Sequence, residues 1–186
     1  FVRTLTSFGF DNGTIIFARV FFSMIIMFLL IVFQDKDLLK IKIKDVPIFI
    51  GTGIIGMLGV NIFYNEAIDN LTLAVSAVLL STAPVIVVLL AAVIFKEKIT
   101  LRKIFCMILA IGGCILATGM LEESISISLY GLIVGIGSAF FYALYSIFSR
   151  MASNRNYDTY TIIFYSVVLI TIVMIPFADI KVIADF

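Results

Sequence analysis

The sequence predicts an all-α membrane protein, a polytopic bundle of transmembrane helices. Of its 186 residues, 62% are hydrophobic, whereas soluble domains contain about 45–50% apolar residues. The apolar residues form continuous runs of about 20 residues, the length that crosses a hydrocarbon core of about 30 Å as an α-helix. A transmembrane barrel would instead need alternating strands of about 10 residues. The runs are 14–33, 46–64, 71–95, 104–121, 128–148 and 160–178.

The cations between these runs predict how the chain crosses the bilayer. Ten Lys and Arg residues fall in the connections 34–45, 95–103 and 149–158, and none falls in 65–70 or 121–126. Because Lys and Arg are enriched in cytoplasmic loops, we expect the first three connections to face the cytoplasm. The segments then expected outside are 1–13, 65–70, 121–127 and 179–186.

The beginning and the end of the sequence resemble each other at an offset of 147 residues. Phe1, Arg3, Asp11, Thr14, Ile15, Ile16, Phe17, Val20, Ile25 and Met27 match Phe148, Arg150, Asp158, Thr161, Ile162, Ile163, Phe164, Val167, Ile172 and Met174. Five crossings separate the two copies, so their orientations in the membrane are opposite. The pattern predicts inverted repeats of five helices, an architecture common among secondary transporters.

The repeat predicts the domain organisation. Residues 1–123 would form the end of helix 1 and helices 2–5, and residues 124–186 would form helices 6–7 and the start of helix 8. Because the sequence begins at Phe1 and ends at Phe186 within apolar segments, we expect it to hold about six and a half of ten helices.

The composition argues against several other functions. The sequence contains no His, which excludes His-based catalytic triads and the HExxH zinc site. It has no phosphate-binding loop, and its net charge of +1 comes with no basic patch for a nucleic acid. Cys106 and Cys114 lie about 12 Å apart along a predicted helix, too far for a disulfide. We expect no catalytic residue, no cofactor, no metal and no nucleic-acid partner.

Arg19 is a permanent cation about five residues inside the first complete run. It would lie roughly 8 Å below the outer boundary, where a charge facing lipid is costly. It either contacts an anionic group of a solute, or it pairs with Glu66 or Asp69, or its side chain reaches the interface. Its counterpart in the second copy is Ser166, which argues weakly against a purely structural role.

The run 46–64 ends in polar residues. Asn61 and Asn65 are four residues apart, so they share one helix face with Tyr64 close by. They either line a substrate cavity or form interhelical hydrogen bonds. Glycines form small-residue rows here and in the run 128–148, and we expect them to permit close helix packing. These glycines are Gly53, Gly56, Gly59, Gly131 and Gly135.

Pro84 interrupts the run 71–95 and predicts a kink. It lacks an N–H donor and clashes with the carbonyl of Leu80. Freed backbone at this depth is tolerated against protein or a cavity, so the kink acts either as a hinge in a pathway or only in packing. The hydroxyl groups expected to bond to this backbone are those of Ser76, Ser81 and Thr82.

Aromatic and hydroxyl side chains in the last two apolar runs suit either an organic solute or helix packing alone. They are Tyr142, Tyr145, Ser146 and Tyr165.

Taken in order, these motifs resemble the EamA family of the drug/metabolite transporter superfamily over nearly the whole chain. Residues 67–119 are similar to its fourth and fifth helices, with Pro84, the turn 96–100 (KEKIT) and Gly112-Gly113. Residues 130–150 look like its sixth helix, and Arg19 stands where members often carry Arg. The resemblance implies ten helices, both termini in the cytoplasm and transport of small metabolites.

We therefore predict a secondary transporter that moves a small metabolite or drug-like solute by alternating access. Family likeness alone favours a bacterial inner membrane. The expected pathway residues are Arg19, Asn61, Tyr64, Asn65, Ser76, Ser81, Tyr142, Tyr145, Ser146 and Tyr165. The expected partners are the solute and the lipid bilayer, with a dimer left open. The alternatives are a non-catalytic subunit or scaffold, and a membrane enzyme whose catalytic part lies outside this sequence.

Overall fold

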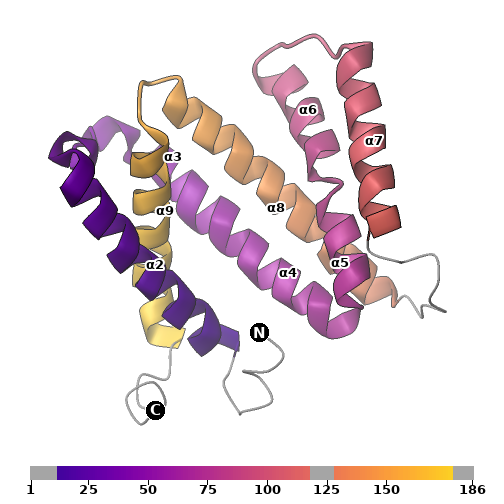
Figure 1. Cartoon of the computed structure of the whole chain (residues 1–186), viewed down its shortest axis with the longest axis horizontal. Helices are drawn as coiled ribbons and strands as arrows, with labels where there is room; N and C mark the ends of the chain where they lie inside the picture. Colours follow the sequence, from indigo (N-terminus) through magenta and orange to yellow (C-terminus); the bar gives the residue numbers. More distant parts are fainter. Residues whose placement is uncertain (1–11, 118–127, 178–186) are drawn as a thin grey trace. The chain divides into compact units, whose positions relative to one another are not determined.

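The computed structural model describes residues 12–117 and 128–177, and the regular elements among them are all helical (Figure 1). The predicted all-α transmembrane fold is confirmed. Within the described residues, four segments are long and apolar enough to cross a membrane: Ile16–Gln34, Ile43–Asn70, Leu73–Ile94 and Leu129–Ser153. The elements are α2 (Asn12–Gln34), η1 (Lys36–Leu39), η2 (Ile43–Asp45), α3 (Val46–Ile50), η3 (Gly51–Leu58), α4 (Gly59–Asn70), α5 (Leu73–Leu80), α6 (Ala83–Ile94), α7 (Leu101–Ala117), α8 (Leu129–Ser153), α9 (Thr159–Met174) and η4 (Ile175–Phe177).

Two helices extend further than the apolar runs predicted. Residues 65–70, expected as an outer connection, form the end of α4, and α8 continues to Ser153 instead of ending at residue 148. Hydropathy marks the depth of the hydrocarbon, whereas helical hydrogen bonding continues into the polar residues beyond it. At the end of this extension the backbone N–H of Leu71 donates to the carbonyl of Ala67 (2.9 Å). Phe1, Arg3, Asp11 and the outer segments 121–127 and 179–186 lie outside the described residues.

The chain forms two compact units, residues 1–54 with 148–186, and residues 55–147. The division falls inside η3, a π-helical turn rich in glycine, and inside α8. It does not coincide with the repeat boundary expected near residue 123. The domain organisation by inverted repeats therefore stays a prediction.

In the first unit, α2 and α9 pack against each other and run in opposite directions (Figure 1). These are the helices that the internal repeat pairs. The Phe28 and Phe164 rings meet across them, with centroids 6.1 Å apart. Just after α2, the Thr161 hydroxyl of α9 donates to the Leu38 carbonyl of η1 (2.8 Å). The start of α9 is thereby held beside the chain that leaves α2.

In the second unit, the end of η3 and α4 lie close to α8 along a row of glycines. A Cβ atom at Gly56 would lie 2.7 Å from the Cα of Tyr145, and one at Gly59 would lie 2.6 Å from the ring of Phe141. A Cβ at Gly131 would lie 2.6 Å from Leu71. Such distances leave no room for a side chain, so these glycines permit close approach. Gly135 is equally close to Leu79, and Gly53, in the first unit, would place a Cβ 2.9 Å from the Ser166 carbonyl.

Gly56→Ala is expected to destabilise the protein by about 1–3 kcal/mol, because the new methyl group meets backbone that must shift. Gly113→Ala is the matched control, since nothing lies within 4 Å of a Cβ there. That change should be neutral or stabilise helix α7 by up to about 1 kcal/mol. Thermal unfolding in detergent compares the two variants. Equal effects of the two substitutions would contradict the packing argument.

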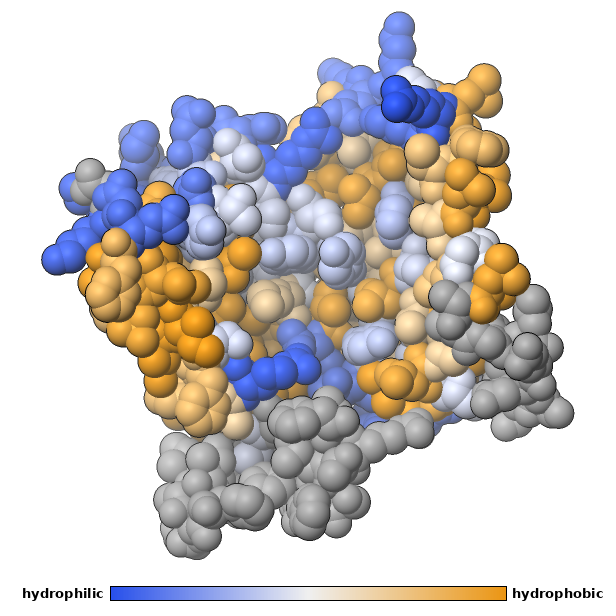
Figure 2. Space-filling view, viewed as in Figure 1, coloured by the Kyte–Doolittle hydropathy of each residue, from blue (hydrophilic) through white to orange (hydrophobic). Residues whose placement is uncertain are grey.

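Still in the second unit, α6 and α7 form an antiparallel hairpin (Figure 1). Their connection carries Lys96 and Lys98, and the first turn of α7 carries Arg102 and Lys103. Lys103 pairs with Glu97 of the connection (3.1 Å). Figure 2 shows hydrophilic residues over this connection and apolar residues along the flank of α7. This distribution is that of a hairpin whose flank faces lipid and whose turn faces water.

Candidate functional site

The candidate site is built by a break in the helical segment Leu73–Ile94. α5 ends at Leu80 and α6 begins at Ala83, with Pro84 in its first turn. The Ser81 hydroxyl donates to the Val78 carbonyl and the Thr82 hydroxyl donates to the Leu79 carbonyl, both at 2.6 Å. These hydroxyls supply hydrogen bonds that a continuous helix would have made through its backbone. Ser76, expected to help, instead donates to Thr72 (3.0 Å), before the break.

A cavity of about 310 Å³ lies at this break, within the second unit. Tyr64 of α4 and Tyr142 of α8 line it opposite residues of the break. Among the residues that the structure describes, none that lines it is charged. The aromatic rings and the Ser81 hydroxyl offer an organic solute apolar contact and a few polar groups, the usual composition of a small-molecule site. The remaining lining residues are Ala77, Leu80, Ala83 and Pro84.

Other predicted pathway residues of this unit are not among the residues that line the cavity. Asn61 donates to the Met57 carbonyl (2.8 Å) inside its own helix. Asn65 is buried. The ring of Tyr145 lies 6.2 Å from that of Tyr142, in tilted contact. The Ser146 hydroxyl donates to the Tyr142 carbonyl (3.1 Å). The structure thus brings Tyr64, Ser81 and Tyr142 to one cavity.

Arg19 and Tyr165 belong to the first unit. Arg19 is exposed on α2, while Ile16 and Val20 beside it are buried. The Tyr165 hydroxyl donates to the Leu39 carbonyl (2.6 Å), which ties α9 to η1. Ser166, the counterpart of Arg19, is fully buried and its hydroxyl lies 2.9 Å from that of Thr52. At this position of the repeat, Ser166 in the second copy is therefore part of the helix packing, whereas Arg19 in the first copy is an exposed cation.

A polar cluster that the sequence did not reveal joins the connection before α3 to the connection before α9. Asp45, whose side chain is 7% exposed, pairs with Arg155. The Tyr157 hydroxyl donates to Asp45 Oδ2 (2.7 Å) and accepts from the Lys42 N–H (3.0 Å). Burial, followed by the bond to Asp45, raises the pKa of Tyr157 above its usual 10.0. The sequence does not single out Asp45, because it is one of three Asp residues among the four Lys residues of the connection 34–45.

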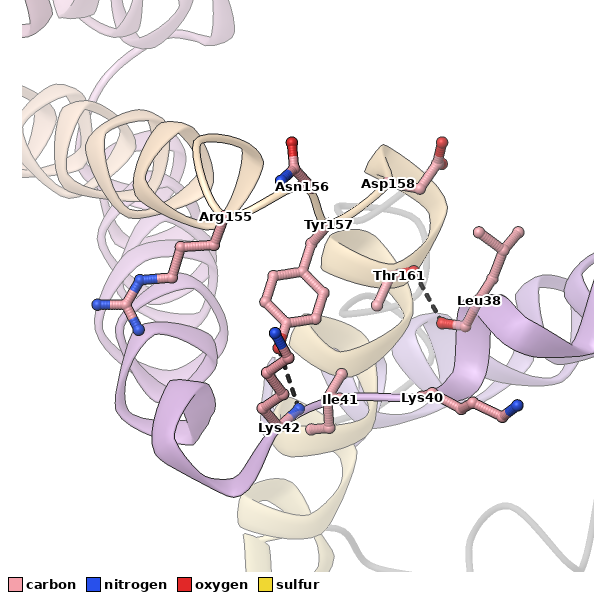
Figure 3. Close-up of a pocket in the computed structure, with 9 residues that line it drawn as sticks. All are labelled: Leu38, Lys40, Ile41, Lys42, Arg155, Asn156, Tyr157, Asp158 and Thr161. Carbon is pink, nitrogen blue, oxygen red and sulfur yellow. Dashed lines mark hydrogen bonds between the residues drawn. The ribbon is translucent and has the colours of Figure 1, made fainter.

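The two connections joined by this cluster are two of the three predicted to face the cytoplasm. They also enclose a second cavity of about 390 Å³, drawn in Figure 3. Its lining residues are Leu38, Lys40, Ile41, Lys42, Arg155, Asn156, Tyr157, Asp158 and Thr161. Their proximity agrees with the predicted placement of both connections on one side of the membrane.

Comparison with known proteins identifies one family and relatives that are named as transporters. The sequence matches the EamA-like transporter family at residues 1–119 and 129–186. It is 28% identical to an uncharacterized transporter of Archaeoglobus fulgidus over 138 residues, which are 74% of this chain and 48% of that protein. It is 32% identical to the pseudopaline exporter CntI of Pseudomonas aeruginosa over 135 residues, 72% of this chain and 45% of that protein. The chain spans about half the length of these curated relatives. No solved structure matches it.

Proposed function

Because the chain belongs to the EamA-like transporter family, we propose that the protein is a membrane transporter and that it moves a small organic solute through the cavity at the helix break. The mechanism proposed is secondary transport by alternating access, with two inverted repeats rocking around a central site. A membrane transporter needs no catalytic residue, so the proposed role is not enzymatic. The relatives are prokaryotic, which supports an inner or plasma membrane.

The observation that carries this proposal is the cavity between Tyr64, Tyr142 and the α5–α6 break. Broken helices at membrane depth occur where the backbone is buried in protein or lines a cavity, and transporters build substrate sites around them. The volume of about 310 Å³ lies at the lower end of the range for small-molecule pockets, about 300–1,000 Å³. The cavity therefore favours a small solute with an apolar portion and few hydrogen-bonding groups.

Transport assays in membrane vesicles test this site. Tyr64→Ala and Tyr142→Ala should each lower kcat/KM for a transported solute at least about tenfold, because each removes one aromatic wall worth about 1.5 kcal/mol or more. The panel contains amino acids, amines and organic acids, measured for uptake and for efflux. Tyr160→Ala is the control, because this tyrosine is exposed at the start of α9 and is not one of the residues that line the cavity.

Two outcomes would contradict the proposal. Normal transport by the double variant Tyr64→Ala/Tyr142→Ala would remove the cavity from the pathway. If the full-length protein moves no solute of the panel in either direction, the scaffold or subunit alternative gains support. Expression level and thermal unfolding of each variant separate loss of transport from loss of fold.

A further inference from the structure

The turn of the α6–α7 hairpin carries the largest excess of positive charge among the three connections predicted to face the cytoplasm. Residues 95–103, which we call the hairpin tip, hold four cations and one carboxylate. Residues 34–45 hold four lysines but also three aspartates, and residues 149–158 hold two arginines and one aspartate. The charge of the hairpin tip is therefore the least balanced of the three.

Most of this charge is directed away from the rest of the protein. Lys103 pairs with Glu97 (3.1 Å), which engages the carboxylate of the tip. Lys96, Lys98 and Arg102 are exposed, and no acidic residue of the described chain pairs with any of them. The helix dipole does not account for Arg102, because it favours cations in the last turn of a helix, whereas Arg102 lies in the first turn of α7. Three cations of the tip thus remain for an anionic partner.

The residues around these cations place the hairpin tip at the depth of lipid head groups. The tip begins directly after the segment Leu73–Ile94, which is long and apolar enough to cross a membrane. Leu101 within the tip is 85% exposed, and Val93 just before it is 78% exposed. Figure 2 shows the hydrophilic tip above the apolar flank of α7. Exposed apolar side chains between cations are typical of the interface, where they contact acyl chains while the charges reach the head groups.

We propose that the hairpin tip is a surface that binds anionic phospholipids of the cytoplasmic leaflet. Clusters of four or more Lys and Arg residues directly beyond a transmembrane helix suit such lipids. Lys96, Lys98 and Arg102 contact the head-group phosphates, and Leu101 enters the adjoining acyl region. A soluble anion would use only the cations, whereas a phospholipid uses both features. The tip shares no residue with the lining of the transport cavity, so this proposal does not depend on the proposed function.

Titration of the full-length protein in detergent with short-chain phosphatidylglycerol tests the cations. Bound lipid is counted by native mass spectrometry. Lys98→Gln/Arg102→Gln should bind about 30-fold more weakly, because each cation near an anionic surface contributes about a fivefold factor. The matched control is Lys36→Gln/Lys44→Gln, which removes two exposed cations from the connection with three aspartates. Its affinity should stay within about threefold of wild type, and Lys98→Arg/Arg102→Lys should retain binding.

A second pair of variants tests the apolar contact of the same surface. Leu101→Ser should weaken the binding of phosphatidylglycerol about fivefold, because it removes an apolar side chain that the lipid covers. Leu116→Ser is the matched control, since Leu116 is also exposed (74%) but lies fifteen residues further along α7. Its affinity should not change. Thermal unfolding of each variant confirms that the fold is retained.

Three results would overturn the proposal. The first is an equal loss of binding in the two glutamine double variants, which would mean diffuse attraction to any cation of the protein. The second is equal affinity of the wild type for phosphatidylcholine, which has the phosphate but no net charge. The third is unchanged binding in Leu101→Ser together with displacement of the lipid by millimolar inorganic phosphate but not by sodium chloride at the same ionic strength. That result would assign the surface to a soluble anion.

Discussion

Arg19→Ala is expected to lower the transport of an anionic or zwitterionic solute about 10- to 100-fold while expression and folding hold. Arg19 lies seven residues after the start of α2, about 10 Å along the helix. Its side chain is exposed, whereas Val20 beside it is buried in the first unit. A cation at that depth is costly unless it meets protein, water or an anion. We propose that it contacts an anionic group of the solute, a bond worth about 1.5–3 kcal/mol.

The measurement is uptake and efflux in vesicles with Arg19→Ala and Arg19→Lys. Lysine keeps the charge but loses the planar pair of donors that matches a carboxylate, so its transport should lie between wild type and alanine. Neutral solutes serve as the internal control, because their transport should change little. If Arg19→Ala transports every solute normally, or lowers neutral and anionic solutes equally, the contact does not exist and Arg19 serves the fold or the interface.

Tyr157→Phe is expected to destabilise the first unit by about 1–2 kcal/mol. The substitution keeps the ring, which packs 5.1 Å from Phe49. It removes the hydroxyl that donates to Asp45 and accepts from the Lys42 N–H. Asp45 then loses one of its two partners while its side chain is almost buried. Thermal unfolding measures the change, and Tyr160→Phe, at an exposed position, is the control.

The stability difference between wild type and Tyr157→Phe should also depend on pH. The pKa of Tyr157 in the folded protein is raised above 10.0, so the unfolded chain releases this proton first as the pH rises. The contribution of the hydroxyl is complete below about pH 10 and is lost as the pH rises through the raised pKa. The difference should therefore shrink above about pH 10. A difference that grows in that range would contradict the assigned hydrogen bonds.

Much of the fold could be predicted because its signals are local. The length and continuity of each apolar run predicted where helices cross the membrane, and four of the segments meet that criterion in the described chain. Pro84 predicted a break from its own chemistry, since proline has no N–H to donate. The predicted ends of the helices were less accurate. At residues 65–70, for example, the helix continues through polar residues, and hydropathy does not mark where such a polar extension ends.

The candidate site could be predicted only in part. Tyr64, Ser81 and Tyr142 were all expected along the pathway, and the structure brings these three to one cavity. Tyr165 was expected there as well, but its hydroxyl is bonded to Leu39 in the other unit. In helices that are apolar on every side, hydropathy gives little indication of which face turns inward. The rotation of each helix about its axis therefore could not be predicted from the sequence and is known only from the packing in the structure.

The sequence by itself determined that this protein is a helical membrane protein of the EamA-like transporter family, because hydrophobic length, Pro84 and the order of family motifs are properties of the chain. Only the tertiary structure decided which distant polar groups meet. Asp45 and Arg155 are 110 residues apart in sequence, yet they pair. The physical reason is that burying apolar surface is non-directional, whereas a hydrogen bond requires two specific atoms in place. Composition therefore predicts the bundle, and packing selects the partners.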